Sequence, residues 1–349
     1  MKKISVTEFI ILSEHHLVFD VRSPEEYNHA HYPGAVSLPL FLDEERKVVG
    51  TAYKKQSKEM AIKLGLDFFG IKMRNMVEEV EKLCDRIQPN NKKILVHCWR
   101  GGMRSAAVAW LLNLYGYDVY VLEGGYKAFR NWVLLQFEYP YQIKVLGGYT
   151  GSAKTETLLE LERLGENIID IEGIANHKGS AFGGIGQMPQ PTQEMFENIL
   201  ALKIYEKNTQ QKTKYFWLED ESQRIGRINI PNAFWSSIRK SNLYFLDIPF
   251  EHRLNFIVQS YGSLEIEALK EATIRIQKRF GPNETKITLA HFEENNIKEA
   301  FENLLHYYDK GYITSLHKRE NVEHLLQKIV LIEISPKTNA ESVLLSIKN

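Results

Sequence analysis

Two glycine-containing loops constrain the fold of this chain more than any other feature of its sequence. Each loop follows a short apolar run typical of a buried strand, at residues 93–98 and 143–148, and each leads into a stretch with apolar residues at helical spacing. Further strand-like runs lie at 17–22 and 118–125, and residues 73–87 have the pattern of an amphipathic helix. Strands that alternate with helices indicate mostly parallel sheets, so we predict the α/β class.

The length of the chain indicates two domains. A single hydrophobic core stops growing at roughly 250–300 residues, whereas this chain has 349 residues of ordinary globular composition, 44% hydrophobic and 25% charged. The strand pattern restarts at about residue 136, so we expect domains at 1–136 and 137–349, the second mainly helical from about residue 250. Its further strand candidates are 167–173, 214–220, 242–249 and 328–334.

Charge and cysteine content exclude several classes of protein. The 44 basic and 44 acidic residues cancel, so the chain as a whole is not a basic nucleic-acid-binding protein, although a local basic cluster would be enough. Two cysteines cannot form a disulfide framework. The N-terminus is not a convincing signal peptide, and no apolar stretch approaches the roughly 18 residues of a membrane helix. We therefore expect a soluble, cytoplasmic protein without membrane contact.

The first loop has a cysteine where a strand ends. Cys98 is followed by Arg100, two adjacent glycines and Arg104, with a helix expected at about 105–115. Inward backbone N–H groups, the helix N-terminus and the two arginines all favour a thiolate. We predict that Cys98 is a nucleophile and that Arg100 and Arg104 hold an anionic donor. The alternative is a buried structural cysteine, which is the better interpretation for Cys84.

The second loop resembles a Walker A P-loop, with the template G-x-x-x-x-G-K-[ST]. Lys154 and Thr155 occupy the lysine and hydroxyl positions, but Ala153 replaces the second glycine, which is tolerable only at negative φ. Such a loop surrounds a phosphate at a helix N-terminus, and Thr155 could reach Mg²⁺. The alternative is a glycine-rich turn with an exposed lysine. The expected phosphate-binding residues are Gly148, Thr150, Gly151, Ser152, Ala153, Lys154 and Thr155.

Acidic residues lie at the ends of the next two expected strands. In open α/β sheets, ligands bind at the carboxyl ends of the strands, so these acids could hold a metal ion or a water, although no metal ligand is certain. The alternatives are helix caps and solvated loop charges. A polar, glycine-rich loop at 177–186 is expected to contact the ligand, unless it is a flexible connector. The active-site candidates are Asp170, Glu172, His177, Ser180, Glu219, Glu221 and Arg224.

Three motifs in the first 130 residues resemble the rhodanese family. They are Asp-Val-Arg with a later His-x-Pro-Gly-Ala at residues 20–35, the Cys-x5-Arg loop that begins at Cys98, and Leu-x-Gly-Gly at 122–125. A rhodanese-like half followed by a P-loop half resembles the bacterial tRNA 2-selenouridine synthase family over nearly the whole chain. That resemblance includes segments at 171–198, 218–231 and 306–312, the last with Lys310 in place of a common proline.

The resemblance implies a rhodanese-like parallel-sheet domain followed by a P-loop NTPase-like α/β domain with a helical C-terminal part. It implies a transferase that acts on 2-thiouridine at the tRNA wobble position. A geranyl group from geranyl diphosphate is transferred to the sulfur, and selenium from selenophosphate then replaces the S-geranyl group. Both are co-substrates, and we expect no tightly bound organic cofactor. Given these reactions, we expect the P-loop to hold the diphosphate and Cys98 to accept selenium.

The implied partners are tRNA and, in addition, an enzyme that supplies selenophosphate. Basic side chains would contact the tRNA phosphates, which dominate nucleic-acid affinity, and tyrosines could stack on a splayed base. The alternatives are solvated surface charges and an aromatic core. The candidates are Arg227, Arg239, Lys240, Arg253, Arg275, Arg279 and Tyr308, with Tyr307 and Tyr312 beside it.

Two other functions are consistent with the sequence. One is a persulfide-forming sulfurtransferase fused to an ATP-dependent small-molecule kinase, which ATP hydrolysis dependent on Lys154 would favour. The other is a non-catalytic tRNA-binding or signalling protein with degenerate loops. Undiminished selenation by a Cys98→Ser variant would favour that second alternative.

Overall fold

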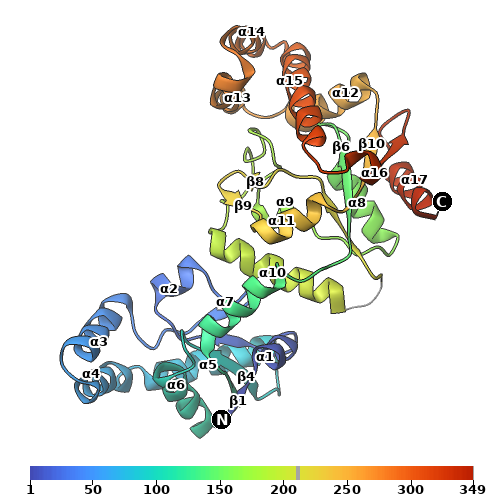
Figure 1. Ribbon diagram of the computed structural model, residues 1–349. Helices are drawn as coiled ribbons and strands as arrows, with labels where there is room; N and C mark the ends of the chain where they lie inside the picture. The colour runs from blue at the N-terminus through green and yellow to red at the C-terminus, as the bar shows by residue number, and fades with distance from the viewer. Residues whose placement is uncertain (210–212, 349) are drawn as a thin grey trace. The chain divides into compact units, whose positions relative to one another are not determined.

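The computed structural model describes residues 1–209 and 213–348 and contains two compact units (Figure 1). The first comprises Met1–Leu135 with Glu197–Ile199, and the second comprises Gln136–Phe196 and the chain from Leu200 onward. The main division lies one residue from the expected domain boundary. Each unit contains a parallel sheet with helices, which confirms the predicted fold class.

The first unit has a five-stranded parallel sheet in the order β1-β5-β4-β2-β3. Strands β2 and β4 lie inside the sheet and are buried along nearly their whole length, as their apolar runs predict. Their carboxyl ends therefore open onto the same edge of the sheet. The strands are β1 (Lys2–Ile4), β2 (Val18–Asp20), β3 (Val36–Ser37), β4 (Lys93–His97) and β5 (Asp118–Leu122).

Two helices of the first unit, at 73–87 and 103–114, bury apolar residues in one core with the strands of this sheet. The predicted helix at 73–87 is confirmed, and it buries Met76, Val80 and Cys84 at helical spacing. Cys84 belongs to the hydrophobic core, so its structural interpretation is also confirmed. The helices are α1 (Val6–Ser13), α2 (Pro24–His29), α3 (Asp43–Lys55), α4 (Lys58–Gly70), α5 (Met73–Ile87), α6 (Met103–Leu114) and α7 (Gly125–Gln136).

The second unit has a four-stranded parallel sheet in the order β11-β10-β6-β7. Strand β6 lies between β10 and β7, so the loop that leaves its carboxyl end has a neighbouring strand end on each side. The strands are β6 (Ile143–Gly148), β7 (Phe216–Glu219), β10 (Asn242–Asp247) and β11 (Leu326–Val330), with a separate antiparallel pair, β8 (Arg224–Ile225) and β9 (Ile228–Asn229).

The C-terminal part of the second unit is mainly helical, as predicted. Helices α12 to α15 share an apolar core that includes Leu254, Phe292 and Phe301, and Phe182 packs into it from a loop. Within the described ranges, no helix combines the length and the hydropathy needed to traverse a lipid bilayer. The helices are α8 (Lys154–Arg163), α9 (Ile171–Ala175), α10 (Gln193–Thr209), α11 (Asn232–Arg239), α12 (Phe250–Tyr261), α13 (Ile266–Phe280), α14 (Pro282–Glu293), α15 (Ile297–His317), α16 (Val322–Leu325) and α17 (Pro336–Lys348).

Residues 167–173 do not form the predicted strand. Only Ile168 bridges Trp217 in parallel, and the chain then enters α9. The carboxylate of Asp170 accepts a hydrogen bond from the backbone N–H of Gly173, and an aspartate at this position stabilises the start of a helix. The capping preference of Asp170 therefore outweighs the β propensity of the preceding isoleucines.

Ala153 adopts the left-handed backbone conformation, with φ 52° and ψ 43°, immediately before α8 begins at Lys154. The condition under which alanine would fit this position without strain, a negative φ, is therefore not met. An L-residue in this region brings its Cβ too close to the carbonyl oxygen that follows. The chain holds a strained residue at the position where the P-loop template has glycine.

We expect an Ala153→Gly variant to be more stable. Removing roughly 1–2 kcal/mol of backbone strain outweighs the roughly 0.4–1 kcal/mol by which glycine favours the unfolded chain. The free energy of unfolding in urea should rise by about 0.5–1 kcal/mol. The matched control is Ala268→Gly inside α13, which should lower it by about 1 kcal/mol. If both variants lost the same unfolding free energy, Ala153 would not be strained.

Candidate active sites in the two units

The Cys98 loop is fixed to the start of α7 by two glycine-rich segments in close contact. The backbone N–H of Tyr126 donates to the Cys98 carbonyl at 2.8 Å. A Cβ on Gly125 would lie 2.4 Å from that same carbonyl oxygen, and one on Gly101 would lie 2.6 Å from the Leu122 carbonyl. Both glycines have positive φ. The Gly-Gly pair at 124–125 is therefore needed so that the cysteine loop can close.

The thiol of Cys98 lies at the base of this loop. It is only 3% exposed, and its Sγ lies 3.2 Å from the hydroxyl of Ser105, in the first turn of α6. Within residues 1–209 and 213–348, the N–H groups of Arg100, Gly101 and Gly102 donate no hydrogen bond to the protein. Unpaired N–H groups at a helix N-terminus form an anion site. The loop can thus hold an anionic group above the sulfur.

The two arginines of the loop differ in whether they form an ion pair. Arg104 forms a two-pronged ion pair with Glu26, with Nη1 to Oε2 at 2.6 Å and Nη2 to Oε1 at 3.3 Å. Glu26 thus fixes the Arg104 guanidinium near Cys98, and its contact with a donor anion stays a prediction. Arg100 is exposed, and in the described part of the chain it has no ion-pair partner.

The Asp-Val-Arg motif contacts Tyr126, which holds the Cys98 loop. Arg22 is 1% exposed and pairs with Asp20 at 2.5 Å, and its guanidinium lies 3.8 Å from the centre of the Tyr126 ring. His97, directly before Cys98, is completely buried beside this pair, with its Nδ1 3.8 Å from an Asp20 oxygen. Burial is the largest cause that lowers the pKa of His97 from 6.5 to about 4.

The P-loop follows β6 and is held from two sides. The hydroxyl of Ser152 donates to the Tyr149 carbonyl at 2.8 Å, and Lys154 Nζ lies 3.2 Å from the Gly148 carbonyl oxygen. Arg253 Nη1 donates to the Thr150 carbonyl at 3.0 Å. The backbone of the expected phosphate cradle is therefore braced by the protein, and the ammonium of Lys154 is folded onto the loop.

A buried arginine and a helix brace this cradle. Arg253 is 3% exposed and forms a two-pronged ion pair with Asp309 of α15, at 2.9 and 2.7 Å. Its prediction as a tRNA-phosphate contact is wrong, because the guanidinium is buried and its hydrogen bonds are used. One turn further along α15, the hydroxyl of Tyr312 donates to Asp220 at 2.7 Å and accepts from the Gly148 N–H at 3.4 Å.

Three carboxylates face Lys154. One oxygen from each of Glu172, Glu219 and Glu221 lies within 4.8 Å of the others. Burial is the largest cause that raises the pKa of each, and repulsion from the neighbouring carboxylates adds to it for Glu172 and Glu219. The positive charge of Lys154 lowers the pKa of all three carboxyl groups and so opposes this effect.

The cluster has the chemistry of a divalent cation site. The Oε1 atom of Glu219 is buried and has no hydrogen-bond partner among the described residues. Carboxylate oxygens are the ligands that Mg²⁺ prefers. The structure brings together three of the acidic candidates, Glu172, Glu219 and Glu221, although Glu172 lies in α9 rather than at the end of a strand. Asp170 caps α9.

The loop at 177–186 closes over these acids. Gly179 has φ +65°, and a Cβ there would lie 2.5 Å from Glu172 Oε1 and 2.6 Å from Glu221 Oε2. Only glycine fits this contact. Ser180 lies on the same loop, and His177 packs against Gly226 of the β8–β9 turn. Arg224 is exposed on that hairpin and donates to the Gly226 carbonyl at 3.0 Å.

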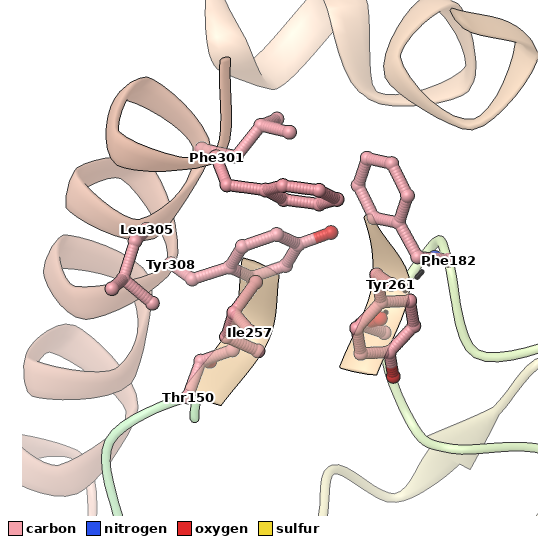
Figure 2. Close-up of a pocket in the computed structure, with 9 residues that line it drawn as sticks. Thr150, Phe182, Ile257, Tyr261, Phe301, Leu305 and Tyr308 are labelled. Atoms are coloured by element: carbon pink, nitrogen blue, oxygen red, sulfur yellow. Dashed lines mark hydrogen bonds between the residues drawn. The ribbon is translucent and has the colours of Figure 1, made fainter. Parts of the chain in front are cut away.

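The remaining tRNA candidates differ in how far their side chains are exposed. Arg239 is partly buried and donates to the Ser315 carbonyl at 2.8 Å. Tyr308 packs into the helical core beside Phe182 (Figure 2), so the aromatic-core alternative describes it. The exposed basic candidates are Arg227, Lys240, Arg275 and Arg279.

Sequence reasoning did not single out Asp309, Arg319 or Tyr261. Arg319 Nη2 pairs with Asp220 at 2.7 Å, and Tyr261 lies on the side of α12 that faces the 177–186 loop. For Asp309 a signal existed, because it lies in the 306–312 segment between Tyr308 and Tyr312. Residues four apart on a helix share a face, so this segment could have been interpreted as one side of a site.

We expect the burial of His97 to make the first unit sensitive to acid. Its pKa is lowered from 6.5 to about 4, so between these values the unfolded chain binds more protons, and stability is lost as the pH falls. Between pH 7.5 and pH 5, the wild type should lose about 2 kcal/mol more unfolding free energy than a His97→Gln variant. The assignment would be contradicted if the unfolding free energies of the wild type and the variant, measured in urea, changed equally with pH.

Comparison with known proteins agrees with this two-part architecture. A rhodanese-like domain model matches residues 10–131, and a model described as tRNA 2-selenouridine synthase AAA domain matches residues 141–279.

Curated relatives match most of the chain. A tRNA 2-selenouridine synthase from Sulfurovum sp. (strain NBC37-1) is 36% identical over 313 residues, covering 84% of this chain and 83% of the relative. One from Hydrogenovibrio crunogenus is 34% identical over 345 residues, covering 90% and 92%. One from Shewanella frigidimarina is 37% identical over 254 residues, covering 72% and 67%. The chain therefore belongs to the tRNA 2-selenouridine synthase family.

Proposed function

We propose that this chain converts 2-thiouridine at the wobble position of tRNA into 2-selenouridine through an S-geranyl intermediate. Geranyl diphosphate and selenophosphate are the co-substrates. Family membership supports the tRNA substrate and the selenium product. One observation carries the two-step scheme. In each unit a parallel strand is followed by a loop suited to binding an anion, and the loop of the first unit contains a thiol, whereas that of the second contains a lysine.

The geranyl transfer is assigned to the second unit. The sulfur of 2-thiouridine attacks C1 of geranyl diphosphate, an S–C bond forms, the C–O bond breaks, inorganic diphosphate leaves and the N3 proton of the base is released to solvent. Charge builds up on the leaving diphosphate as that bond breaks, and fixed positive groups near it stabilise the transition state. The N–H groups of the P-loop and the ammonium of Lys154 are such groups.

Mg²⁺ is the cation that fits the acidic cluster. Glu172, Glu219 and Glu221 would hold it through carboxylate oxygens, and Thr155 lies beside Glu219. When bound, the ion would neutralise charge on the diphosphate. Without a cation, the three carboxylates would repel a diphosphate. A bound Mg²⁺ would therefore explain why acidic side chains lie beside a loop that binds anions.

The selenium exchange is assigned to the first unit. In balance, a C2–Se bond forms, the C2–S bond breaks and geranylthiol leaves, while water cleaves the P–Se bond and gives phosphate. Cys98 lies at the centre of this site, beneath the N–H groups that can hold the selenophosphate anion. Arg100 is the exposed cation beside it. We propose that the Cys98 thiol lies beside the hydrogenselenide that attacks C2 and moves its proton to the departing geranylthiolate, without an S–Se bond, which would need a two-electron oxidant.

The proposal predicts that the two steps can be separated by mutation. Full-length protein is incubated with 2-thiouridine tRNA and geranyl diphosphate, then with selenophosphate, and the nucleosides are read by mass spectrometry. Lys154→Ala should slow geranylation by roughly 10²–10³. Cys98→Ser should still form the geranylated nucleoside but fail to incorporate selenium.

Matched controls are Lys337→Ala, exposed on α17, and Cys84→Ser in the core of the first unit. Both should retain both steps. Selenium exchange at the wild-type rate in Cys98→Ser, or geranylation at the wild-type rate in Lys154→Ala, would contradict the assignment. ATP hydrolysis that depends on Lys154, with no change in the tRNA, would favour the sulfurtransferase–kinase alternative.

A further inference from the structure

A short segment of α10, Glu197–Ile199, belongs to the first unit, although the rest of that unit ends at Leu135. Asn198, at the centre of this segment, is 0% exposed, and its side chain is a polar amide. A buried polar group costs free energy unless it forms hydrogen bonds. The partners of Asn198 therefore show what this segment contributes to the first unit.

The amide of Asn198 is fully paired. Its Nδ2 atom donates to the Tyr126 hydroxyl at 2.7 Å and to the His31 carbonyl at 2.9 Å. Its Oδ1 atom accepts from Arg130 Nη1 at 2.6 Å. A guanidinium only donates and a carbonyl oxygen only accepts, so these partners fix which end of the amide is the oxygen. An apolar side chain of similar size could pair with none of the three.

Two of these partners lie on one face of α7. Tyr126 and Arg130 are four residues apart, a spacing that makes side chains neighbours on a helix. The first turn of α7 also holds the cysteine loop, because the N–H of Tyr126 donates to the Cys98 carbonyl at 2.8 Å. Asn198 therefore fixes the hydroxyl end of a tyrosine whose backbone fixes Cys98.

The third partner connects the same tyrosine to residues 30–31. The carbonyl of Ala30, directly before that of His31, accepts from Arg22 Nη2 at 2.8 Å. The Arg22 guanidinium also lies 3.8 Å from the centre of the Tyr126 ring. Tyr126 is thus held at its ring by Arg22 and at its hydroxyl by Asn198. All three of these side chains are buried, so the ring is fixed in one position.

The start of α7 also touches the backbone nitrogens that would form the anion cradle. An ideal Cβ on Gly125, the residue before Tyr126, would lie 2.4 Å from the Gly101 nitrogen and 2.8 Å from the Arg100 nitrogen. Closely packed groups transmit displacement to one another. A shift in the first turn of α7 would therefore move the N–H groups of the cysteine loop.

We propose that Asn198 is a positioning residue of the Cys98 site and acts through Tyr126 on the backbone that holds the anionic donor. The inference rests on the proposed function, which assigns the selenium exchange to this loop. Asn198 is not a catalytic residue in this scheme, because its amide is used by Tyr126, His31 and Arg130.

The test measures anion binding directly at Cys98. Full-length protein is alkylated with iodoacetamide at fixed pH and increasing concentrations of inorganic phosphate, and the modified Cys98 peptide is quantified by mass spectrometry. Phosphate held by the loop N–H groups lies over the sulfur and should slow the reaction. The variants are compared by the half-protection concentration, which is the phosphate concentration that halves the alkylation rate.

Asn198→Ala should raise the half-protection concentration about tenfold, because the Tyr126 hydroxyl loses the buried amide that donates to it. The matched control is Asn113→Ala, which removes an amide donor to the Tyr117 carbonyl in the last turn of α6 and should leave that concentration unchanged. An unchanged value in Asn198→Ala would overturn the proposal, as would wild-type protein that phosphate does not protect.

A second variant traces the route and decides the proposal even if Asn198→Ala does not fold. Tyr126→Phe removes only the hydroxyl that accepts from Asn198 and should raise the half-protection concentration at least about threefold. In the double variant the combined effect should be smaller than the product of the two single effects, because both changes interrupt one chain of contacts. An unchanged value in Tyr126→Phe, or effects that multiply, would overturn the route through Tyr126.

The positioning role and the proposed function can fail independently. A raised half-protection concentration in Asn198→Ala, with no selenium incorporated into tRNA by the wild type, would leave the positioning role standing and reject the proposed reaction. Selenium incorporation by the wild type, with equal half-protection concentrations in the two proteins, would do the reverse.

Discussion

The burial of three carboxylates opposite one lysine is the constraint on which the second unit depends. Glu172, Glu219 and Glu221 lie too close together, with Glu219 fully buried, to carry three negative charges without compensation. Lys154 balances only part of this charge. The free protein must keep protons on the cluster or bind a cation there. Bound diphosphate beside this cluster would add further negative charge, which a divalent cation between them would balance.

Both anion-binding loops are braced by a buried arginine–aspartate pair. In the first unit Arg22 pairs with Asp20 and stacks on Tyr126, whose N–H holds the Cys98 carbonyl. In the second unit Arg253 pairs with Asp309 and itself holds a carbonyl of the P-loop. A charged pair buried in this way leaves a large penalty if one partner is lost. The pairs therefore fix loop geometry rather than offer their charges to substrates.

Local patterns predicted the longer strands, the two loops and the fold class, because apolar runs and glycine spacing are local properties, but they missed the short strands and wrongly predicted one at 167–173. Glu172 joins the cluster from α9, where a strand was expected, but the position of Glu219 and Glu221 after a buried strand was predictable as well, because ligands bind at the carboxyl ends of parallel strands. The roles of Arg253 and Arg104 were not, because their partners Asp309 and Glu26 lie far away in the sequence.

The central claim is that the P-loop and the three carboxylates form one site for a diphosphate and a divalent cation. Calorimetric titration of inorganic diphosphate into the full-length protein, with Mg²⁺ and with a chelator, tests it most directly. The account predicts that Mg²⁺ strengthens diphosphate binding at least about tenfold and, by linkage, that diphosphate strengthens Mg²⁺ binding by the same factor. The coupling should be lost in a Glu219→Gln variant. Equal diphosphate affinity with and without Mg²⁺ would contradict the account.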